Sequence, residues 1–165
     1  MTLDARVRTV EPLRTTTLFD IVVDLRPRVE FGVDGPVGRR VLYGAAGGSF
    51  RGPRLGGEVL AQGGDWALFR TDGTMMLDVR LALRTEDEAL IHMSYGGRWA
   101  IPPQVRDDMA TPAGRLRVDP ADYYFRINPV FETGSERYRW LNDVVAVGTG
   151  YLVEGGVAYH VEQIL

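Results

Sequence analysis

The sequence contains no cysteine and no lysine, and only two histidines. Without cysteine the chain can form no disulfide, thiol nucleophile or cysteine-bound metal site. Without lysine it can form no Schiff base, and no lysine can serve as its acid or base. The histidines, His92 and His160, lie in neither an H-x-H nor an H-E-x-x-H pattern. We therefore predict that the protein holds no metal ion.

Long apolar runs and basic stripes are also missing. No stretch approaches the length of a membrane-spanning helix, and the first residues lack the apolar core of a signal peptide. The 19 arginines are spread among 22 acidic residues for a net charge of −3, which argues against a nucleic-acid surface. The chain has neither a phosphate loop nor a G-x-S-x-G nucleophile motif. We expect a cytoplasmic protein with no nucleic-acid or membrane partner and no cofactor.

Period-two alternation dominates from about Leu18 onward. Met75, Leu77 and Val79 would share one face of a strand, with Asp78 and Arg80 on the other. Short glycine-rich turns separate such segments, which is typical of hairpins. The predicted strands are Leu18–Leu25, Arg28–Phe31, Val37–Tyr43, Ser49–Leu60, Trp66–Arg70, Met75–Arg84, Ala89–Tyr95, Tyr123–Asn128, Leu141–Val153 and Val157–Ile164.

This pattern predicts an all-β fold, a single antiparallel up-and-down β-barrel of roughly eight to ten strands within one domain over residues 1–165. A β-sandwich is the alternative. Gly96–Ala121 is rich in proline and has no strand period, so it is either a lid or disordered, with a short helix at Pro103–Met109. Residues 1–14 are a frayed tail or an edge segment.

Two local signatures identify a family. One is the glycine-rich run Gly47–Gly57 with the Gly64-Asp65-Trp66 turn and Asp72-Gly73, and the other combines Tyr123–Arg126 with Phe131–Gly134 and Tyr138–Asn142. In order and spacing they resemble the domain of unknown function (DUF) 3237 family of small β-barrel proteins. The chain departs from that family at Glu86-Asp87-Glu88, where members commonly have an Asp-Gly turn.

The resemblance implies a single antiparallel barrel that binds small organic molecules. It also implies, for some members, a place in secondary-metabolite or aromatic-compound pathways. The family motif includes Arg126, whose guanidinium would orient a carboxylate, phenolate or enolate if it faced inward.

Three residues are candidates for catalysis. Asp65 stands beside Trp66, where partial desolvation would raise its pKa and suit it to proton transfer; the alternative is a turn aspartate that caps backbone amides. Glu132 is a second candidate carboxylate, and Arg126 is the candidate oxyanion partner.

The candidate ligand-binding residues are mostly aromatic. Tyr138 and Trp140 would face the same side if their segment were extended, and Asn142 would hold a ligand oxygen. Alternatively, Trp140 plugs the barrel end and Asn142 forms a turn. His92 is either a general base or a buried structural histidine. The full set is Trp66, His92, Tyr95, Tyr124, Tyr138, Trp140 and Asn142.

Two functions remain open from the sequence. The first is a cofactor-independent acid/base enzyme of cyclase, lyase or isomerase type that acts on a small hydrophobic or aromatic metabolite. The second is a non-catalytic small-molecule carrier or sensor of lipocalin type. We expect a single cavity inside the barrel, lined by Trp66, by Tyr124 or Arg126, and by Trp140, with Asp65 or Glu132 at its polar end. Whether the protein acts as a monomer or a homodimer stays open.

Overall fold

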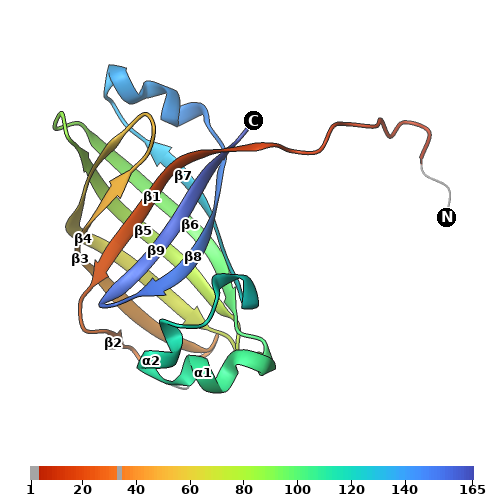
Figure 1. Ribbon diagram of the computed structural model, residues 1–165, viewed down its shortest axis with the longest axis vertical. Helices are drawn as coiled ribbons and strands as arrows, with labels where there is room; N and C mark the ends of the chain where they lie inside the picture. Colours follow the sequence, from red (N-terminus) through yellow and green to blue (C-terminus); the bar gives the residue numbers. More distant parts are fainter. Residues whose placement is uncertain (1–3, 33–34) are drawn as a thin grey trace.

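The protein is a closed antiparallel β-barrel, seen in a computed structural model that describes residues 4–32 and 35–165 (Figure 1). The strands are β1 (Thr15–Leu25), β2 (Val29–Glu30), β3 (Arg39–Arg51), β4 (Gly56–Phe69), β5 (Met75–Thr85), β6 (Leu90–Ala100), β7 (Tyr124–Glu132), β8 (Ala146–Val153) and β9 (Gly156–Ile164). Strands β3 to β9 pair in chain order, and β1 closes the ring by pairing with both β9 and β3. The short β2 pairs with β3. The predicted up-and-down barrel is confirmed.

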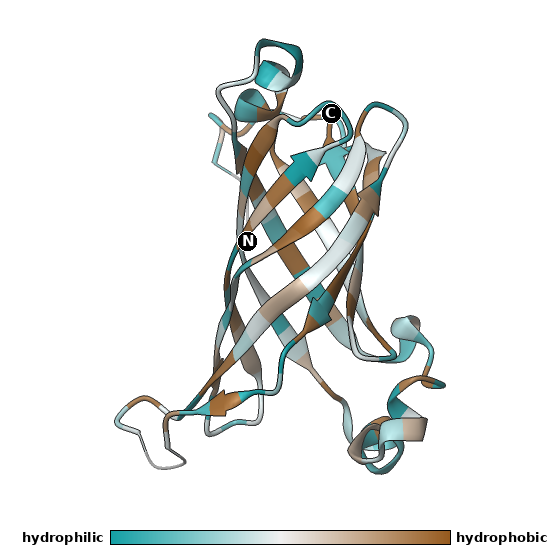
Figure 2. Cartoon of the chain, turned by 90° about the vertical axis from the view of Figure 1, so that its left-hand side faces the viewer, coloured by the Kyte–Doolittle hydropathy of each residue, from teal (hydrophilic) through white to brown (hydrophobic). Residues whose placement is uncertain are grey.

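Side chains alternate between the inside and the outside of the barrel, as the period-two pattern predicts. On β5, Leu77 and Val79 are buried, whereas Asp78 and Arg80 face outward and form an exposed ion pair at 2.8 Å. Bands of hydrophobic and hydrophilic residues accordingly alternate along the strands (Figure 2). Such a surface pair contributes little to stability, so the inner residues hold the barrel together.

The two halves of the barrel interior differ in packing. At one end the ring of Phe19, which is fully buried, meets the rings of Phe50 and Phe131 edge-on at centroid distances of 5.5 and 5.8 Å. The 3-10 helix η3 (Glu136–Asp143) covers this end and adds the buried Leu141. The opposite end is hollow and holds the cavity described below.

Short helices cover the hollow end (Figure 1). They are η1 (Pro103–Val105), α1 (Arg106–Ala110), α2 (Pro112–Arg115) and η2 (Pro120–Asp122). We call residues 101–123 the lid. The helix expected at Pro103–Met109 is present as η1 and α1. None of the helices among the described residues is long and apolar enough to cross a membrane.

Several predicted boundaries are wrong. β3 and β4 each run without the gap that the sequence predicted, and β7 continues to Glu132 instead of ending at Asn128. Gly96 to Ala100 belong to β6 rather than to the lid, since Gly96 and Gly97 pair with Asn128 and Ile127. The sequence did not predict this, because glycines have no side chain that could show the strand period. The expected strand Ser49–Leu60 is interrupted by a turn in which the Gly52 amide donates to the Leu55 carbonyl at 2.8 Å. The expected strand Leu141–Val153 begins only at Ala146, since its first residues belong to η3.

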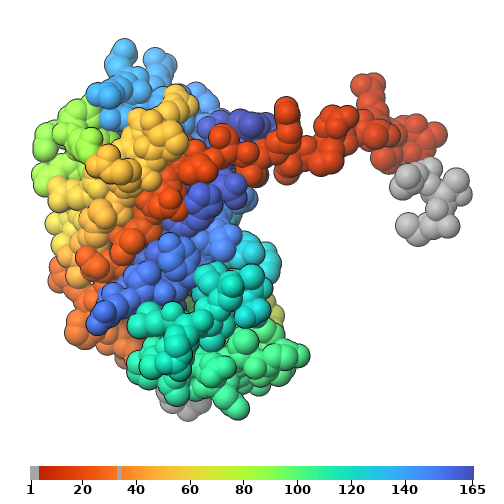
Figure 3. Space-filling model, in the orientation of Figure 1, coloured from red at the N-terminus to blue at the C-terminus, as the bar shows by residue number. Residues whose placement is uncertain are grey.

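The N-terminal segment, residues 4–14, extends away from the barrel before β1 begins (Figure 3). Its residues are exposed and form no strand, and Val7, Val10 and Leu13 are 61%, 81% and 75% exposed. The segment is therefore an extended tail and not an edge strand of the barrel.

The turn that joins β5 to β6 contains the residue Glu88 with a φ of 65°. This left-handed conformation costs a residue with a Cβ about 1 kcal/mol, and glycine adopts it freely. The Glu88 side chain is exposed, and its nearest charged partner is Arg84 at 3.6 Å, so little is lost with it. We expect Glu88→Gly to stabilise the fold by about 0.5–1 kcal/mol and to raise the melting temperature by about 2–3 °C.

The control for this change is Glu86→Gly in the same turn. Among the described non-glycine residues only Glu88 has a positive φ, so glycine at position 86 relieves no strain and adds chain entropy to the unfolded state. We expect Glu86→Gly to lower the melting temperature. If thermal unfolding moved both variants in the same direction, strain at Glu88 would not be the cause.

Candidate functional site

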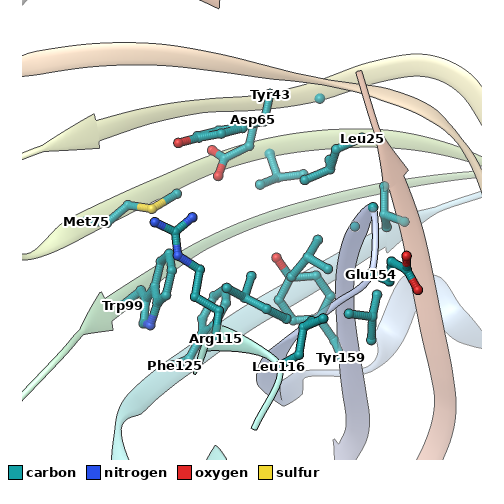
Figure 4. Close-up of a pocket in the computed structure, with 18 of the residues that line it drawn as sticks. Leu25, Tyr43, Asp65, Met75, Trp99, Arg115, Leu116, Phe125, Glu154 and Tyr159 are labelled. Atoms are coloured by element: carbon teal, nitrogen blue, oxygen red, sulfur yellow. The ribbon is translucent and has the colours of Figure 1, made fainter. Parts of the chain in front are cut away.

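The hollow end of the barrel contains a cavity of about 480 Å³ that opens beside the lid (Figure 4). Strands β1, β3, β4, β5, β6, β7, β8 and β9 contribute to its wall, together with α2 and the turn between β8 and β9. Its wall is mainly apolar. The lining residues are Val23, Leu25, Tyr43, Gly64, Asp65, Met75, Val79, Leu81, Tyr95, Trp99, Pro112, Ala113, Arg115, Leu116, Phe125, Leu152, Val153, Glu154, Gly155, Gly156, Val157 and Tyr159.

A row of side chains crosses four neighbouring strands on the inner face. Tyr43 of β3 lies opposite Asp65 of β4, Asp65 lies opposite Val79 of β5, and Val79 lies opposite Tyr95 of β6. Directly opposed residues of antiparallel strands share a face, so the buried Val79 fixes the others as inward-facing. We call Tyr43, Asp65, Val79 and Tyr95 the inner row.

Glycines allow β4 to approach its neighbours just before Asp65. A Cβ at Gly63 would lie 2.1 Å from the Arg80 carbonyl oxygen, and a Cβ at Gly64 would lie 2.5 Å from that of Tyr43. Both residues also have positive φ values, in a stretch where the pairing of β4 with β5 shifts in register. The Gly-Gly-Asp sequence is therefore a strand bulge that leads into an inward-facing aspartate.

The Asp65 carboxylate lies in a largely buried position, where a negative charge is poorly solvated. Its Oδ1 accepts a hydrogen bond of 3.0 Å from the Asp78 amide. Burial raises the pKa of Asp65 from 3.8 to about 6, and this outweighs the Asp78 hydrogen bond and the Arg40 charge, which lower it. A carboxylate poised in this range can both accept and donate a proton near neutral pH.

Two buried phenols lie near this carboxylate. The rings of Tyr95 and Tyr159 meet edge-on at a centroid distance of 5.4 Å, so the two phenols lie side by side on the cavity wall. Burial raises the pKa of both phenols far above the ordinary value of 10.0, so both stay neutral. A neutral phenol keeps its O–H, so either hydroxyl can donate to a ligand oxygen.

The lid places one charged side chain at the cavity. Thr111 caps α2, since its Oγ1 accepts from the Gly114 amide at 3.0 Å. Gly114 permits tight packing, because a Cβ there would lie 2.0 Å from the Asp108 carbonyl oxygen. The next residue, Arg115, lines the cavity, and its guanidinium is directed toward Asp65 and Met75 (Figure 4).

Of the ten candidate residues expected from the sequence, two line this cavity, Asp65 and Tyr95. Trp66, Tyr124 and Arg126 do not, because each precedes or follows an inward-facing residue of an extended strand and so faces outward. The Arg126 guanidinium instead lies 5.4 Å from the Tyr124 ring centroid and donates to the Phe125 carbonyl. The expected lining by Trp66, by Tyr124 or Arg126, and by Trp140 is therefore wrong for this cavity.

His92 and Glu132 also lie on the outer face, on neighbouring strands. They are cross-strand partners, and the His92 Nδ1 lies 3.8 Å from the Glu132 Oε2. Both side chains are exposed, at 48% and 85%, so His92 is not the buried structural histidine considered above.

The remaining three candidates lie at the packed end of the barrel, far from the cavity along the strands. They belong to η3, so Tyr138 and Trp140 do not share a strand face as an extended segment would require. Trp140 packs beneath the Arg54 guanidinium, 3.5 Å from its ring centroid. Asn142 accepts from the Thr133 amide and donates to the Thr133 carbonyl, which is the turn-forming alternative.

Most lining residues were not predicted from the sequence, among them Tyr159, Tyr43 and Arg115. Tyr159 alternates with Val157 and Val161 in a clear period of two, so its inward direction was readable. Tyr43 lies in a glycine-rich stretch where the period is broken. Arg115 lies in the lid, whose sequence has no strand period, so the direction of its side chain could not be predicted.

No group of three or more histidine, aspartate or glutamate side chains in the described part of the chain forms a metal site. The absence of a metal and of any other cofactor stays a prediction. One donor of the cavity wall lacks a partner among the described residues, the buried Nε1–H of Trp99. This nitrogen is shielded from solvent, so it does not offer a hydrogen bond to a ligand in the cavity.

Comparison with known proteins gives consistent matches over nearly the whole chain. The family model for protein of unknown function DUF3237 matches residues 13–164. A UPF0311 protein of Clostridium acetobutylicum is 32% identical over 141 residues, which cover 86% of this chain and 87% of that protein.

Solved structures share the barrel. A β-barrel-like protein of Acinetobacter baumannii superposes with a TM-score of 0.82 at 33% identity, over 95% of this chain and 99% of that one. A protein of Penicillium herquei described as an enzyme superposes with a TM-score of 0.71 at 23% identity, over 96% and 99% of the two chains. At that identity the last likeness concerns the fold.

Proposed function

We propose that the chain, which belongs to the DUF3237 family of proteins of unknown function, is a cofactor-independent acid/base enzyme that acts on a small hydrophobic or aromatic metabolite inside its barrel. Cyclase, lyase and isomerase steps all combine proton transfer with an oxygen that gains negative charge. The observation that carries the proposal is the inner row, which sets the Asp65 carboxylate among buried phenols in an apolar cavity.

In this proposal Asp65 and the phenol pair have separate roles. The ionised Asp65 accepts a proton from an acidic C–H or O–H of the ligand, and the electron pair left behind moves onto a conjugated ligand oxygen. A hydroxyl of Tyr95 or Tyr159 donates a hydrogen bond to that oxygen. Protonated Asp65 then returns the proton at another ligand atom, which completes an isomerisation, elimination or ring closure without any redox change.

The shape of the protein is compatible with catalysis. The Penicillium herquei protein of the same fold is described as an enzyme. Because one fold hosts many functions, this likeness adds only that such a barrel accommodates an active site. Support for catalysis in this chain therefore comes from its own residues, Asp65 and the phenols of the cavity wall.

Proton exchange tests the proposal without knowledge of the natural substrate. The protein is incubated in D₂O with a panel of aromatic ketones and phenols, and deuterium incorporation at carbon is followed by mass spectrometry. We expect wild-type protein to accelerate incorporation for some of them, and Asp65→Asn to lower the rate by on the order of 10²-fold, because the amide cannot accept the proton.

Asp78→Asn is the matched control for this experiment. Asp78 lies on the neighbouring strand, and its side chain is on the outer face, paired with Arg80 at 2.8 Å. Its backbone amide, which bonds to Asp65, is unchanged by the substitution. We expect Asp78→Asn to keep its rate within a few-fold of wild type. Equal rates in all three proteins would mean that Asp65 is not the base.

The second candidate function is a carrier or sensor of lipocalin type. It is favoured by the mainly apolar wall, which includes Leu25, Met75 and Phe125. If panel members bound in the cavity and wild-type protein accelerated no exchange, this second function would replace the first.

A further inference from the structure

One basic side chain reaches the cavity among the described residues, that of Arg115. The other ionised side chains of the wall are Asp65 and Glu154, and the Glu154 carboxylate lies on the far side of the cavity, beside the turn between β8 and β9 (Figure 4). A negatively charged ligand would therefore be repelled by two positions of the wall and attracted by one. Such a ligand would therefore bind with its charged end toward Arg115 and away from Glu154.

The Arg115 guanidinium is fixed in position by uncharged groups. Its Nε donates to the Met109 carbonyl at 2.6 Å, and its Nη2 donates to the Ala110 carbonyl at 3.3 Å. Both carbonyls belong to α1, so the lid itself holds the side chain over the cavity. A guanidinium has five N–H donors, and these two bonds leave three of them for a ligand.

The charge of Arg115 is not neutralised by any carboxylate of the described residues. Several arginines of the barrel wall have an acidic partner, such as Arg84 with Glu58 and Arg80 with Asp78. No ion pair joins Arg115 to a described acidic residue, and the arginine whose charge acts on Asp65 is Arg40. The Arg115 guanidinium is nevertheless directed toward the Asp65 carboxylate, so the two charged groups share one part of the cavity (Figure 4).

We propose that the ligand of this cavity is an organic anion, a small apolar or aromatic molecule with a negatively charged oxygen group that the Arg115 guanidinium binds. This inference rests on the proposed function and names its substrate class. The charged oxygen lies at the lid, the ring system fills the apolar cavity, and the reacting part lies against Asp65. Arginine suits the task because its planar fork binds a carboxylate or sulfonate through two parallel hydrogen bonds.

A pair of fluorescent probes with the same ring system tests the charge preference. Anilinonaphthalene sulfonate carries a negative charge, and N-phenylnaphthylamine lacks the sulfonate and is neutral. Both are titrated into wild type, Arg115→Gln, Arg115→Lys and Arg117→Gln. Arg117 is the matched control, because it is an exposed arginine two residues further along that does not line the cavity.

We expect Arg115→Gln to weaken binding of the anionic probe by about tenfold and to change binding of the neutral probe by less than about twofold. Arg115→Lys should recover part of the loss, and Arg117→Gln should behave like wild type. The inference is overturned if the anionic probe is unaffected, or if both probes weaken equally, which would mean that Arg115 only supports the lid. It is also overturned if neither probe binds wild type.

The two proposals fail in different ways. If Arg115→Gln removes the anion preference and no substrate ever exchanges protons at Asp65, the protein carries organic anions and the enzyme proposal falls. If exchange depends on Asp65 and anionic substrates exchange equally fast with and without Arg115, the enzyme proposal stands and the anion inference falls.

Discussion

Replacing Asp65 with asparagine is expected to make the protein more stable above about pH 6, by about 3 kcal/mol, while removing its proposed catalytic base. The asparagine carbonyl can still accept the hydrogen bond from the Asp78 amide. The asparagine amide is uncharged, so no ionised group has to be desolvated when the protein folds. The cost of burying the Asp65 charge is therefore removed. The melting temperature should rise by about 5–10 °C near pH 8.

The sign of this effect follows from linkage. The pKa of Asp65 is raised from 3.8 to about 6 in the folded protein, so the folded state binds the proton more tightly than the unfolded state. Stability from this group is therefore greatest below pH 4 and declines as the pH rises toward 6. The gain from Asp65→Asn should be near zero at about pH 3 and complete above about pH 7.

Urea unfolding of wild type and variant across this pH range measures the difference. Asp78→Asn removes a charge of the same sign from the outer face and serves as the control for a general change in net charge. A stabilisation by Asp65→Asn that did not change with pH would show that Asp65 does not titrate between these limits. A loss of stability at every pH would assign the carboxylate a structural role.

The fold was predictable because several long strands, among them β5 and β7, carry the two-residue period of buried and exposed side chains. Where that period is hidden, prediction failed for identifiable reasons. Gly96 and Gly97 have no side chain to report a face, and a Cβ at Gly97 would lie only 2.6 Å from the Arg126 carbonyl oxygen. The segment Glu136–Asp143 carries aromatic residues that fit a strand as well as a helix, and it forms a 3-10 helix under tertiary contacts.

The site was only partly predictable, because direction into a barrel depends on the phase of each strand. Asp65 was found through its neighbouring glycines and tryptophan. The guanidinium that the sequence reasoning assigned to Arg126 belongs to Arg115 in the cavity, and no local pattern in a proline-rich lid aims a side chain. Phase also explains why Glu132 lies outside, since it follows the buried Phe131.

Truncation of Phe19 is expected to have the largest effect on stability and no effect on the cavity. Phe19 is fully buried at the packed end, where its ring contacts those of Phe50 and Phe131. Phe19→Ala should cost about 3–5 kcal/mol, because the rigid strands cannot close the space that the ring leaves. Thermal unfolding should show a fall of about 10 °C or more.

Phe125→Ala is the matched change at the hollow end. Phe125 is 2% exposed and stacks on Trp99 at a centroid distance of 5.2 Å, but it also lines the cavity. One side of its ring therefore already lacks packing partners, and its loss enlarges an existing space, so we expect a cost of about 2–3 kcal/mol. Neutral-probe affinity should fall for Phe125→Ala and stay unchanged for Phe19→Ala. If both variants lost affinity equally, the packed end would not be independent of the ligand site, because the barrel would respond to truncation as one body.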